Sequence, residues 1–150
     1  DGSWYGRWGT NYIYGTWSVL TALEEAGVNA GEAYIRKAVN WLYRMQNEDG
    51  GWGEGNDSYY PPRHWRPHPS TSFQTAWALL ALLSAGEIDT PQVEAGVQYL
   101  LKTQHGDGFW YDEDFTAPGF PRVFYLKYHG YTRYFPLWAL ARYQKLKATA

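Results

Sequence analysis

A sixteen-residue phrase occurs twice in this chain, at residues 37–52 and 95–110, so that each shared position recurs after 58 residues. In both copies an aromatic residue and a leucine are followed by a glutamine and then by an Asp-Gly-x-Trp tail. Residues 1–4 repeat that tail without the helix that precedes it. A fixed period of this length indicates repeated supersecondary units. The truncated third copy predicts that the chain is the end of something longer.

Apolar residues at helical spacing predict five helices, over residues 15–26, 31–46, 72–85, 91–104 and about 134–147. Gly27 and Gly86 end the first and third helices, and Thr90 caps the fourth with Pro91 in its first turn. Residues 53–71 are rich in Gly, Pro, Asn and Ser and lack periodicity, which is typical of a long loop. No strand signal of consequence is present. The order predicts an all-α fold, an arc or barrel of helical hairpins.

The repeated phrase has a mechanical explanation. A glutamine that closes a helix can bond the free backbone groups at the end of that helix and at the start of the next. The glycines of the tail supply positive φ and let the backbone approach the indole closely. We therefore interpret the repeated glutamine and tryptophan positions of the phrase as structural clamps between hairpins and not as catalytic groups. These positions are Gln46, Trp52, Gln104, Trp110 and Trp4.

Composition narrows the function classes. The net charge of -2 carries no block of like charges, which argues against nucleic-acid binding, and the absence of cysteine leaves no disulfide or thiolate site. No apolar run is long enough to span a bilayer. No Gly-x-Ser-x-Gly turn is present, so no nucleophilic serine is predicted. The four histidines, His64, His68, His105 and His129, have no metal-like spacing, so no metal or cofactor is predicted. Aromatic residues make up 19%, with nine Trp and fourteen Tyr, which indicates a ring-lined surface.

The phrase resembles the QW motif of the squalene-hopene and oxidosqualene cyclases. Four further segments resemble the same family, and the bacterial squalene-hopene branch fits best: residues 4–9 (WYGRWG), 11–16 (NYIYGT), 74–79 (QTAWAL) and 119–121 (GFP). The resemblance covers essentially the whole chain. It implies that residues 1–150 form one domain, the C-terminal half of the catalytic barrel, with about half of an α/α toroid.

The resemblance also implies a set of residues that line the substrate cavity, namely Trp8, Tyr14, Phe120, Phe124, Tyr128 and Tyr131. In this family protonation of squalene starts a polycyclisation, and aromatic faces stabilise the migrating cation by about 2 kcal/mol or more each without reacting with it. By the same comparison Tyr14 lies near the proton-donating end and helps to order water there. The spacing of residues 120, 124 and 128 predicts a helical connector that presents these rings as one ladder.

The proton donor of the family, an Asp-x-Asp-Asp motif, does not occur in this sequence. The nearest string is Asp112-Glu113-Asp114-Phe115, which lacks the last Asp and for which a solvated turn is the preferred interpretation. We therefore assign no catalytic residue and expect the chain to be inactive alone. Arg7, Arg122 and Arg133 are interpreted as partners of helix ends or carboxylates, because a hydrocarbon offers them no phosphate.

Several alternatives stay open from the residues. A half ring would expose apolar edges, which predicts a homo-oligomer, possibly a dimer that re-forms the ring. An engineered or ancestral repeat scaffold could bind apolar ligands without turnover. A carbohydrate-active barrel would need paired carboxylates, which Glu54, Asp57, Asp112 and Asp114 could supply. For the intact family the resemblance implies a squalene-like ligand and peripheral membrane contact on the cytoplasmic side, and the fragment is expected to be soluble.

Overall fold

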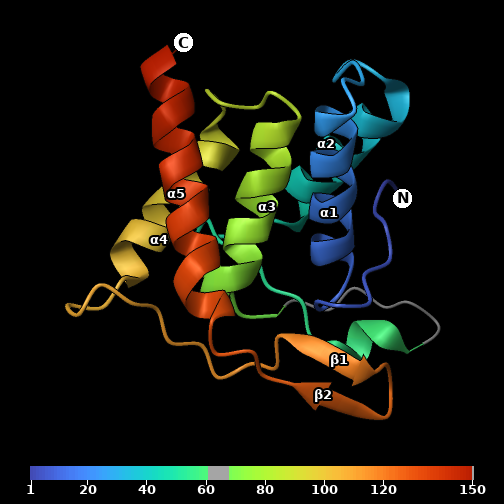
Figure 1. The fold of residues 1–150 in the computed structure, drawn as a ribbon, viewed down its shortest axis with the longest axis vertical. Coiled ribbons are helices and arrows are strands. Elements are labelled where there is room, and N and C mark those ends of the chain that lie inside the picture. Colours follow the sequence, from blue (N-terminus) through green and yellow to red (C-terminus); the bar gives the residue numbers. More distant parts are fainter. Residues whose placement is uncertain (61–67, 150) are drawn as a thin grey trace.

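The computed structural model describes residues 1–60 and 68–149, and Figure 1 shows its ribbon. The predicted all-α class is confirmed for this part of the chain, with one short 3₁₀ helix and a small two-stranded sheet in addition. The elements are α1 (Tyr12–Glu25), α2 (Ala33–Met45), η1 (Asn56–Tyr59), α3 (Ser72–Ser84), α4 (Pro91–Thr103), β1 (Ala117–Phe120), β2 (Phe124–Leu126) and α5 (Tyr131–Thr149).

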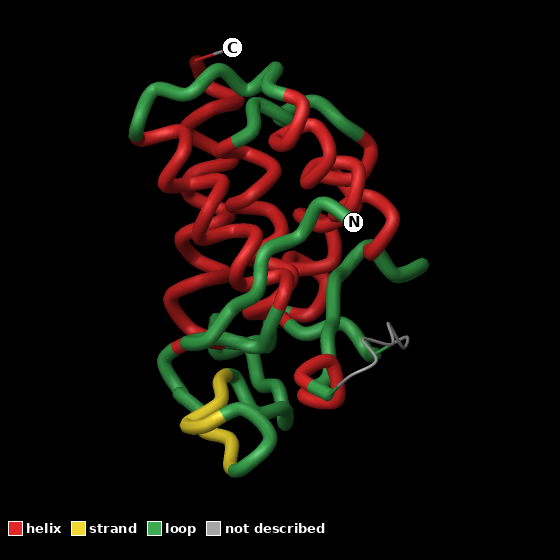
Figure 2. The backbone as a smooth tube through the Cα atoms, turned by 90° about the vertical axis from the view of Figure 1, so that its right-hand side faces the viewer, coloured by secondary structure: helices red, strands yellow, loops and turns green. Residues whose placement is uncertain are grey.

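Helix α3 is the centre of the fold, and it lies between α1 and α5 while α4 packs behind it (Figure 1). Every residue from Ser72 to Ser84 is buried, as the all-round apolar pattern of this segment predicts. Thr71 caps the helix by accepting a hydrogen bond from the Gln74 amide at 3.2 Å. Figure 2 shows the helices stacked together and the two strands at the lower end of the molecule.

The connector before α5 is a β-hairpin, so the predicted helical ladder is wrong. Strands β1 and β2 pair antiparallel, and Phe120 lies opposite Phe124. Pro118 and Pro121 cannot donate helical hydrogen bonds, and each restricts the residue before it to extended conformations. Arg122 turns the chain with a φ of 68°. Two prolines within four residues therefore outweigh the i, i+4 spacing of the rings.

Two helices begin earlier than the periodicity predicts. Helix α1 starts at Tyr12 because the backbone N–H groups of its first turn donate to the distant carboxylate of Glu54, at 3.0 to 3.2 Å. Helix α5 starts at Tyr131 and continues through Pro136, which is buried within it. A local pattern contains no information about a capping group forty residues away.

The predicted loop 53–71 contains η1, and its last residue pairs with the first QW tail. The Thr71 N–H donates to the Trp52 carbonyl at 3.0 Å, which forms an isolated antiparallel bridge. His64, one of the four histidines considered above, lies outside the described residues.

The two complete copies of the phrase have the same indole geometry. The Trp52 Nε1–H donates to the Leu42 carbonyl at 2.8 Å, and the Trp110 Nε1–H donates to the Leu100 carbonyl at 2.9 Å. Trp52 is fully buried and Trp110 is 3% exposed. Each indole therefore donates a hydrogen bond to a carbonyl group near the end of the helix that precedes it.

The glutamines of the two copies differ in their partners. The Gln46 Nε2 donates to the Gly50 carbonyl and to the Gln92 carbonyl in the first turn of α4, both at 2.8 Å. The Gln104 Nε2 donates to the Gly108 carbonyl at 2.9 Å. The first copy thus joins two hairpins, whereas the bond of the second copy stays within its own tail.

The glycines of the tails also differ in how closely they pack on a neighbouring helix. A Cβ on Gly2 would lie 2.5 Å from the Lys37 carbonyl oxygen, and one on Gly50 would lie 2.7 Å from the Ala95 carbonyl oxygen. Lys37 and Ala95 are equivalent positions in the two copies, so each tail packs on the outer helix that follows it. Gly108 has the same positive φ, 86°, but a Cβ there would meet no atom within 4 Å.

We expect substitution of the two glutamines by alanine to have unequal costs. Gln46→Ala removes two hydrogen bonds, one within its own tail and one to the Gln92 carbonyl of α4, and should lower the free energy of unfolding by about 1 to 2 kcal/mol, whereas Gln104→Ala removes only the bond within its tail and should cost less than about 1 kcal/mol. Urea denaturation of both variants measures the difference. Equal losses would contradict the assignment of Gln46 as the residue that joins the hairpins.

Candidate functional site

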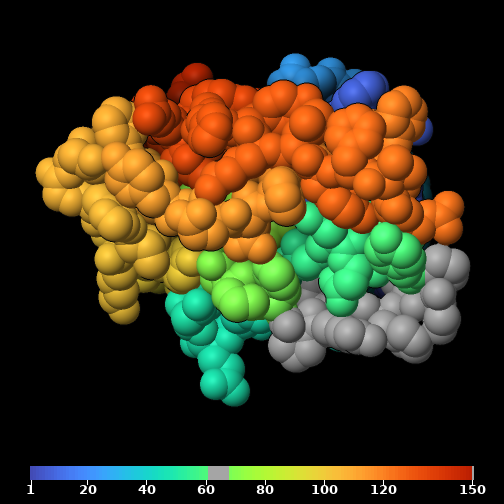
Figure 3. Space-filling view, turned by 90° about the horizontal axis from the view of Figure 1, so that it is seen from below, coloured from blue at the N-terminus to red at the C-terminus, as the bar shows by residue number. Residues whose placement is uncertain are grey.

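The six residues that the sequence predicts to line a cavity lie at one end of the helices, which is the lower end in Figure 1. Trp8 precedes α1 and Tyr14 is in its first turn; Phe120 and Phe124 belong to the hairpin; Tyr128 and Tyr131 lie at the start of α5. We call these six residues the aromatic surface. Figure 3 views this end, where the segment that contains the hairpin covers much of the face beside η1.

Direct contacts join five members of the aromatic surface in two groups, Phe120 with Phe124 and Tyr131 with Tyr128 and Trp8. Phe120 and Phe124 pack at 5.6 Å between ring centroids, and Tyr128 stacks on Tyr131 at 5.1 Å. The Tyr131 hydroxyl lies 3.4 Å from the Trp8 carbonyl oxygen, which it contacts as a weak donor. Trp8 is 62% exposed and Phe120 56% exposed, so much of this apolar surface faces outward.

Trp77 packs against the inner side of the aromatic surface. It is fully buried on α3, and its ring makes edge-to-face contacts with Tyr14 at 5.0 Å and with Tyr131 at 5.8 Å. Phe135 of α5 packs on the same indole at 5.5 Å. One buried ring therefore contacts members of the aromatic surface from α1 and α5. Helical spacing predicts that Trp77 lies in a helix, but nothing in the local pattern identifies these partners.

Tyr14 and Tyr131 of the aromatic surface are neutral at physiological pH. Burial raises the pKa of Tyr14 above its usual value, and burial together with the nearby Tyr14 hydroxyl raises the pKa of Tyr131 to about 12. A positive charge does lie at the edge of the surface, because the Arg7 guanidinium carbon is 5.7 Å from the Trp8 ring and 5.9 Å from the Phe120 ring. The rings of Trp8 and Phe120 thus form cation–π contacts with the Arg7 guanidinium group.

Hydrogen bonds attach the hairpin and the N-terminal segment to the helices. The Thr116 hydroxyl accepts from the Tyr128 N–H at 2.8 Å, and the Thr116 carbonyl accepts from the Thr10 N–H at 3.0 Å. The Gln74 side-chain amide of α3 donates to the Thr10 carbonyl at 3.0 Å. The aromatic surface is therefore held on buried polar contacts.

The carboxylates considered for a paired acid and base have structural partners. Glu54 accepts from the N-terminus of α1, and Asp112 accepts from the Ser72 N–H and hydroxyl at the N-terminus of α3. Burial raises the pKa of both carboxyls, although the N–H donors oppose that shift. Asp114 binds His68 at 2.7 Å. These bonds favour a structural role for the string 112–114 and disfavour the carbohydrate-active alternative.

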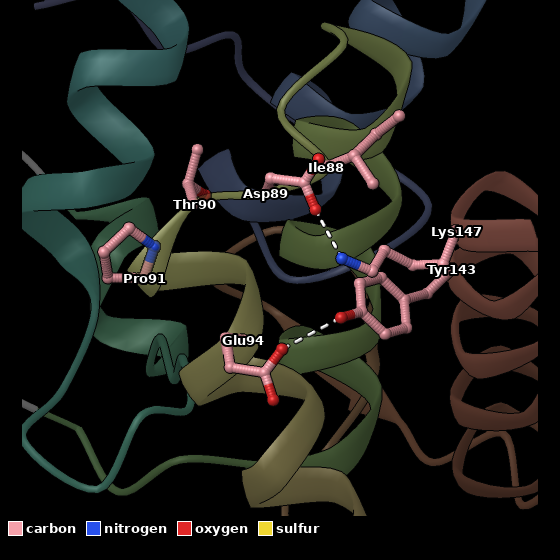
Figure 4. A pocket seen from close by; sticks show the side chains of 7 residues that line it. All are labelled: Ile88, Asp89, Thr90, Pro91, Glu94, Tyr143 and Lys147. Atoms are coloured by element: carbon pink, nitrogen blue, oxygen red, sulfur yellow. Dashed lines mark hydrogen bonds and ion pairs between the residues drawn. The ribbon is translucent and has the colours of Figure 1, made fainter. Parts of the chain in front are cut away.

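Other features of the described residues lie away from the aromatic surface. A depression of about 270 Å³ between α4 and α5 is closed by polar pairs, with Lys147 bound to Asp89 at 2.5 Å and Tyr143 donating to Glu94 at 2.9 Å (Figure 4). Within residues 1–60 and 68–149 no three His, Cys, Asp or Glu side chains are grouped to hold a metal ion. No helix in that part has the length and apolarity needed to cross a membrane.

Comparison with known proteins gives consistent matches over nearly the full chain. The family model described as squalene-hopene cyclase C-terminal domain matches residues 1–145. The squalene-hopene cyclase of Bradyrhizobium diazoefficiens is 60% identical over 150 residues, which are 99% of this chain and 23% of that protein. The squalene-hopene cyclase of Alicyclobacillus acidocaldarius is 48% identical over 145 residues, 97% of this chain and 23% of that protein.

A plant relative also matches. The dammaradiene synthase of Dryopteris crassirhizoma is 44% identical over 158 residues, 96% of this chain and 23% of that protein. In each case the chain corresponds to a C-terminal portion and spans about a quarter of the length of the relatives that it matches.

We expect the His68–Asp114 pair to stabilise the fold only over a window of pH. The hydrogen bond raises the pKa of His68, so its contribution is complete below the ordinary histidine value of about 6.5 and is lost as pH rises through the raised value. The same bond lowers the pKa of Asp114, so the contribution is also lost as pH falls well below about 4.

Urea unfolding of the unsubstituted chain and of His68→Gln at pH 5 and pH 9 tests this expectation. The difference in free energy of unfolding should be larger at pH 5, and below about 1 kcal/mol because both side chains are partly exposed. Asp114→Asn should show the same dependence and add nothing in the double variant. A difference that grows at pH 9 would contradict the pairing.

Proposed function

Because this chain belongs to the squalene-hopene cyclase family, we propose that it supplies part of the aromatic wall of a cavity in which proton-initiated cyclisation converts squalene to hopanoids. Residues 1–150 then act as one domain, the C-terminal half of a catalytic α/α barrel. The observation that carries the proposal is the gathering of six aromatic residues from two distant stretches of the sequence, residues 8–14 and 120–131, at one end of the helices.

The wall stabilises positive charge without reacting with it. A carbocation near Trp8, Phe120 or Phe124 interacts with ring faces that are not nucleophiles, while the neutral hydroxyls of Tyr14 and Tyr131 add dipoles and no full charge. The packing of these rings on buried Trp77 and on the hairpin keeps them in place before the charge develops. The wall therefore contributes stabilisation of cationic transition states, with Tyr14 ordering water near the end at which the proton is supplied.

The proton comes from a part of the protein that this sequence does not include. No Asp-x-Asp-Asp motif is present, and the buried carboxylates Glu54 and Asp112 bind helix N-termini. Neither is arranged with a second free carboxylate that would keep it protonated and strongly acidic. The isolated chain is therefore inactive in cyclisation, and uptake of apolar ligands without turnover is the activity that remains to it.

The chain also self-associates through the exposed face of α5. Leu137 is 64% exposed, and Tyr134 and Trp138 are 49% and 44% exposed on the same helix. Apolar groups at this spacing on one helix form a continuous stripe. A two-fold pair that covers the stripe would extend the arc toward a ring, and in the intact family the apolar rim would also contact lipid peripherally, where squalene is drawn from the membrane.

A chimeric enzyme tests the wall. Residues 1–150 replace the matching segment of the Bradyrhizobium diazoefficiens cyclase, and squalene turnover is measured by product analysis. We expect turnover in the chimera and none with the isolated chain. Phe124→Leu should lower kcat about 30-fold, which corresponds to the loss of about 2 kcal/mol of cation stabilisation.

Tyr111→Leu provides the matched control, because Tyr111 is 55% exposed but belongs to the segment after the second QW tail. It should leave kcat unchanged. An unaffected Phe124→Leu enzyme, or equal losses in both variants, would refute the proposed wall.

Light scattering tests the self-association. We expect the isolated chain to form a dimer at micromolar concentration and Leu137→Glu to be monomeric, because a charge on the stripe cannot be buried without a partner. Leu101→Glu places the same charge at a leucine of α4 that is 50% exposed, and it should remain dimeric. A strictly monomeric unsubstituted chain would rule the pair out.

A further inference from the structure

The turn that presents Trp8 is closed from its inner side by a single hydroxyl group. The Tyr59 hydroxyl lies 2.9 Å from the Gly6 carbonyl oxygen and 3.0 Å from the Gly9 carbonyl oxygen. These two carbonyls flank Trp8 in the sequence, so one shared proton ties both sides of the turn. The Trp8 ring itself is 62% exposed and has little packing of its own.

Tyr59 is well placed to act as an anchor, because it is only 7% exposed and lies at the end of η1. Its ring contacts Tyr5 of the N-terminal segment at 5.6 Å and Tyr125 of β2 at 6.2 Å. Tyr125 follows Phe124 directly in the hairpin. One side chain therefore contacts both the segment that carries Trp8 and the hairpin that carries Phe120 and Phe124, and Figure 1 shows η1 beside the hairpin.

The protonation state of the Tyr59 hydroxyl allows it to donate these hydrogen bonds. Burial raises the pKa of Tyr59 far above its usual value, and the nearby carboxylate of Glu54 adds to the shift. The hydroxyl consequently keeps its proton at physiological pH and can donate to both carbonyls. The two carbonyls gain a donor that a phenylalanine at this position could not supply.

The turn also fits closely against Tyr14. A Cβ on Gly9 would lie 2.3 Å from the Tyr14 ring, and one on Gly6 would lie 2.2 Å from the Asn11 carbonyl oxygen. The backbone of residues 6–9 can approach α1 this closely only because both positions are glycine. Hydrogen bonds hold this turn at both glycines: the Gly6 N–H donates to the Asn11 side chain at 3.2 Å, and the Tyr59 hydroxyl bonds the carbonyls of Gly6 and Gly9. The Tyr59 hydroxyl is the group that joins the two ends of the turn, so it influences the direction in which Trp8 points.

We propose that Tyr59 is a positioning residue whose hydroxyl closes the turn 6–9 and thereby fixes Trp8 relative to Phe120 and Phe124. The inference rests on the proposed function, in which Trp8 is part of the cavity wall. It gives the segment after the first QW tail, which the sequence predicts only as a loop, a defined task in shaping that wall.

The substitution Tyr59→Phe tests the proposal, since it removes the hydroxyl and keeps the ring contacts with Tyr5 and Tyr125. The 150-residue chain is labelled with 5-fluorotryptophan, and the Trp8 resonance is assigned by its loss in Trp8→Phe. We expect the Trp8 fluorine resonance to move toward the shift of the unfolded chain and to narrow in Tyr59→Phe. An unchanged resonance would overturn the proposal.

Tyr99→Phe is the matched control. The Tyr99 hydroxyl donates to the Ser70 carbonyl at 2.8 Å, so this variant also removes a tyrosine-to-carbonyl bond, but one at the far side of α3 from the turn. The Trp8 resonance should be unaffected. An equal change in both variants would mean that Trp8 reports general loosening and would also overturn the proposal.

A measurement on the unsubstituted chain covers the case in which Tyr59→Phe does not fold. The transverse relaxation of the Trp8 fluorine is compared with that of Trp77, which is fully buried. Comparable relaxation supports a fixed Trp8, whereas relaxation as slow as in the urea-unfolded chain would overturn the proposal.

Turnover in the chimera separates this inference from the proposed function. Tyr59→Phe should lower kcat for squalene with little change in KM, because a misdirected Trp8 weakens stabilisation of the cation more than binding of the hydrocarbon. A moved Trp8 resonance with unchanged kcat would support the positioning role and count against Trp8 as part of the wall. An unmoved resonance refutes the positioning role whatever the turnover.

Discussion

The fold depends on one buried carboxylate. Glu54 is 3% exposed, and its oxygens accept the N–H groups of Asn11, Tyr12 and Ile13 at the start of α1. Its backbone is bonded on both sides to the Gln74 side chain of α3, at 2.9 Å. Burying a carboxylate is costly, but three N–H donors and the helix dipole offset that cost. The segment with Trp8, the first turn of α1 and the start of α3 are all located by this one group.

The QW phrase organises the fold at a larger scale than this buried site. The indole of each complete copy donates to a carbonyl of the helix before it, and the tails that contain Gly2 and Gly50 pack on the outer helix that follows them, so hairpins add in one direction. Because α1, α3 and α5 all begin at the same end, the segments that precede them gather there (Figure 1). The aromatic surface is therefore a consequence of how the hairpins are joined, and its rings come from segments that are far apart in the sequence.

Sequence patterns located what depends on neighbouring residues. Helical spacing found all five long helices, the Thr90-Pro91 start of α4 was read correctly, and the period of the phrase indicated stacked hairpins. The hairpin differs from the prediction because ring spacing favours a helix at 120–128, whereas Pro118 and Pro121 oppose one. The first turn of α1 and the support of the aromatic surface by Trp77 and Tyr59 arise from contacts across tens of residues, which no periodicity encodes.

The contrast between Gly50 and Gly108 has an evolutionary consequence. Both have positive φ, but only Gly50 is pressed against a neighbouring backbone within the described residues. Natural variation should therefore be filtered more strictly at position 50, and a residue such as Asn, which tolerates this backbone conformation, could drift into position 108. A consensus averaged over the copies of the phrase would hide that difference. It treats the two positions as equal because both are glycine with positive φ, although only one of them packs against a neighbouring helix.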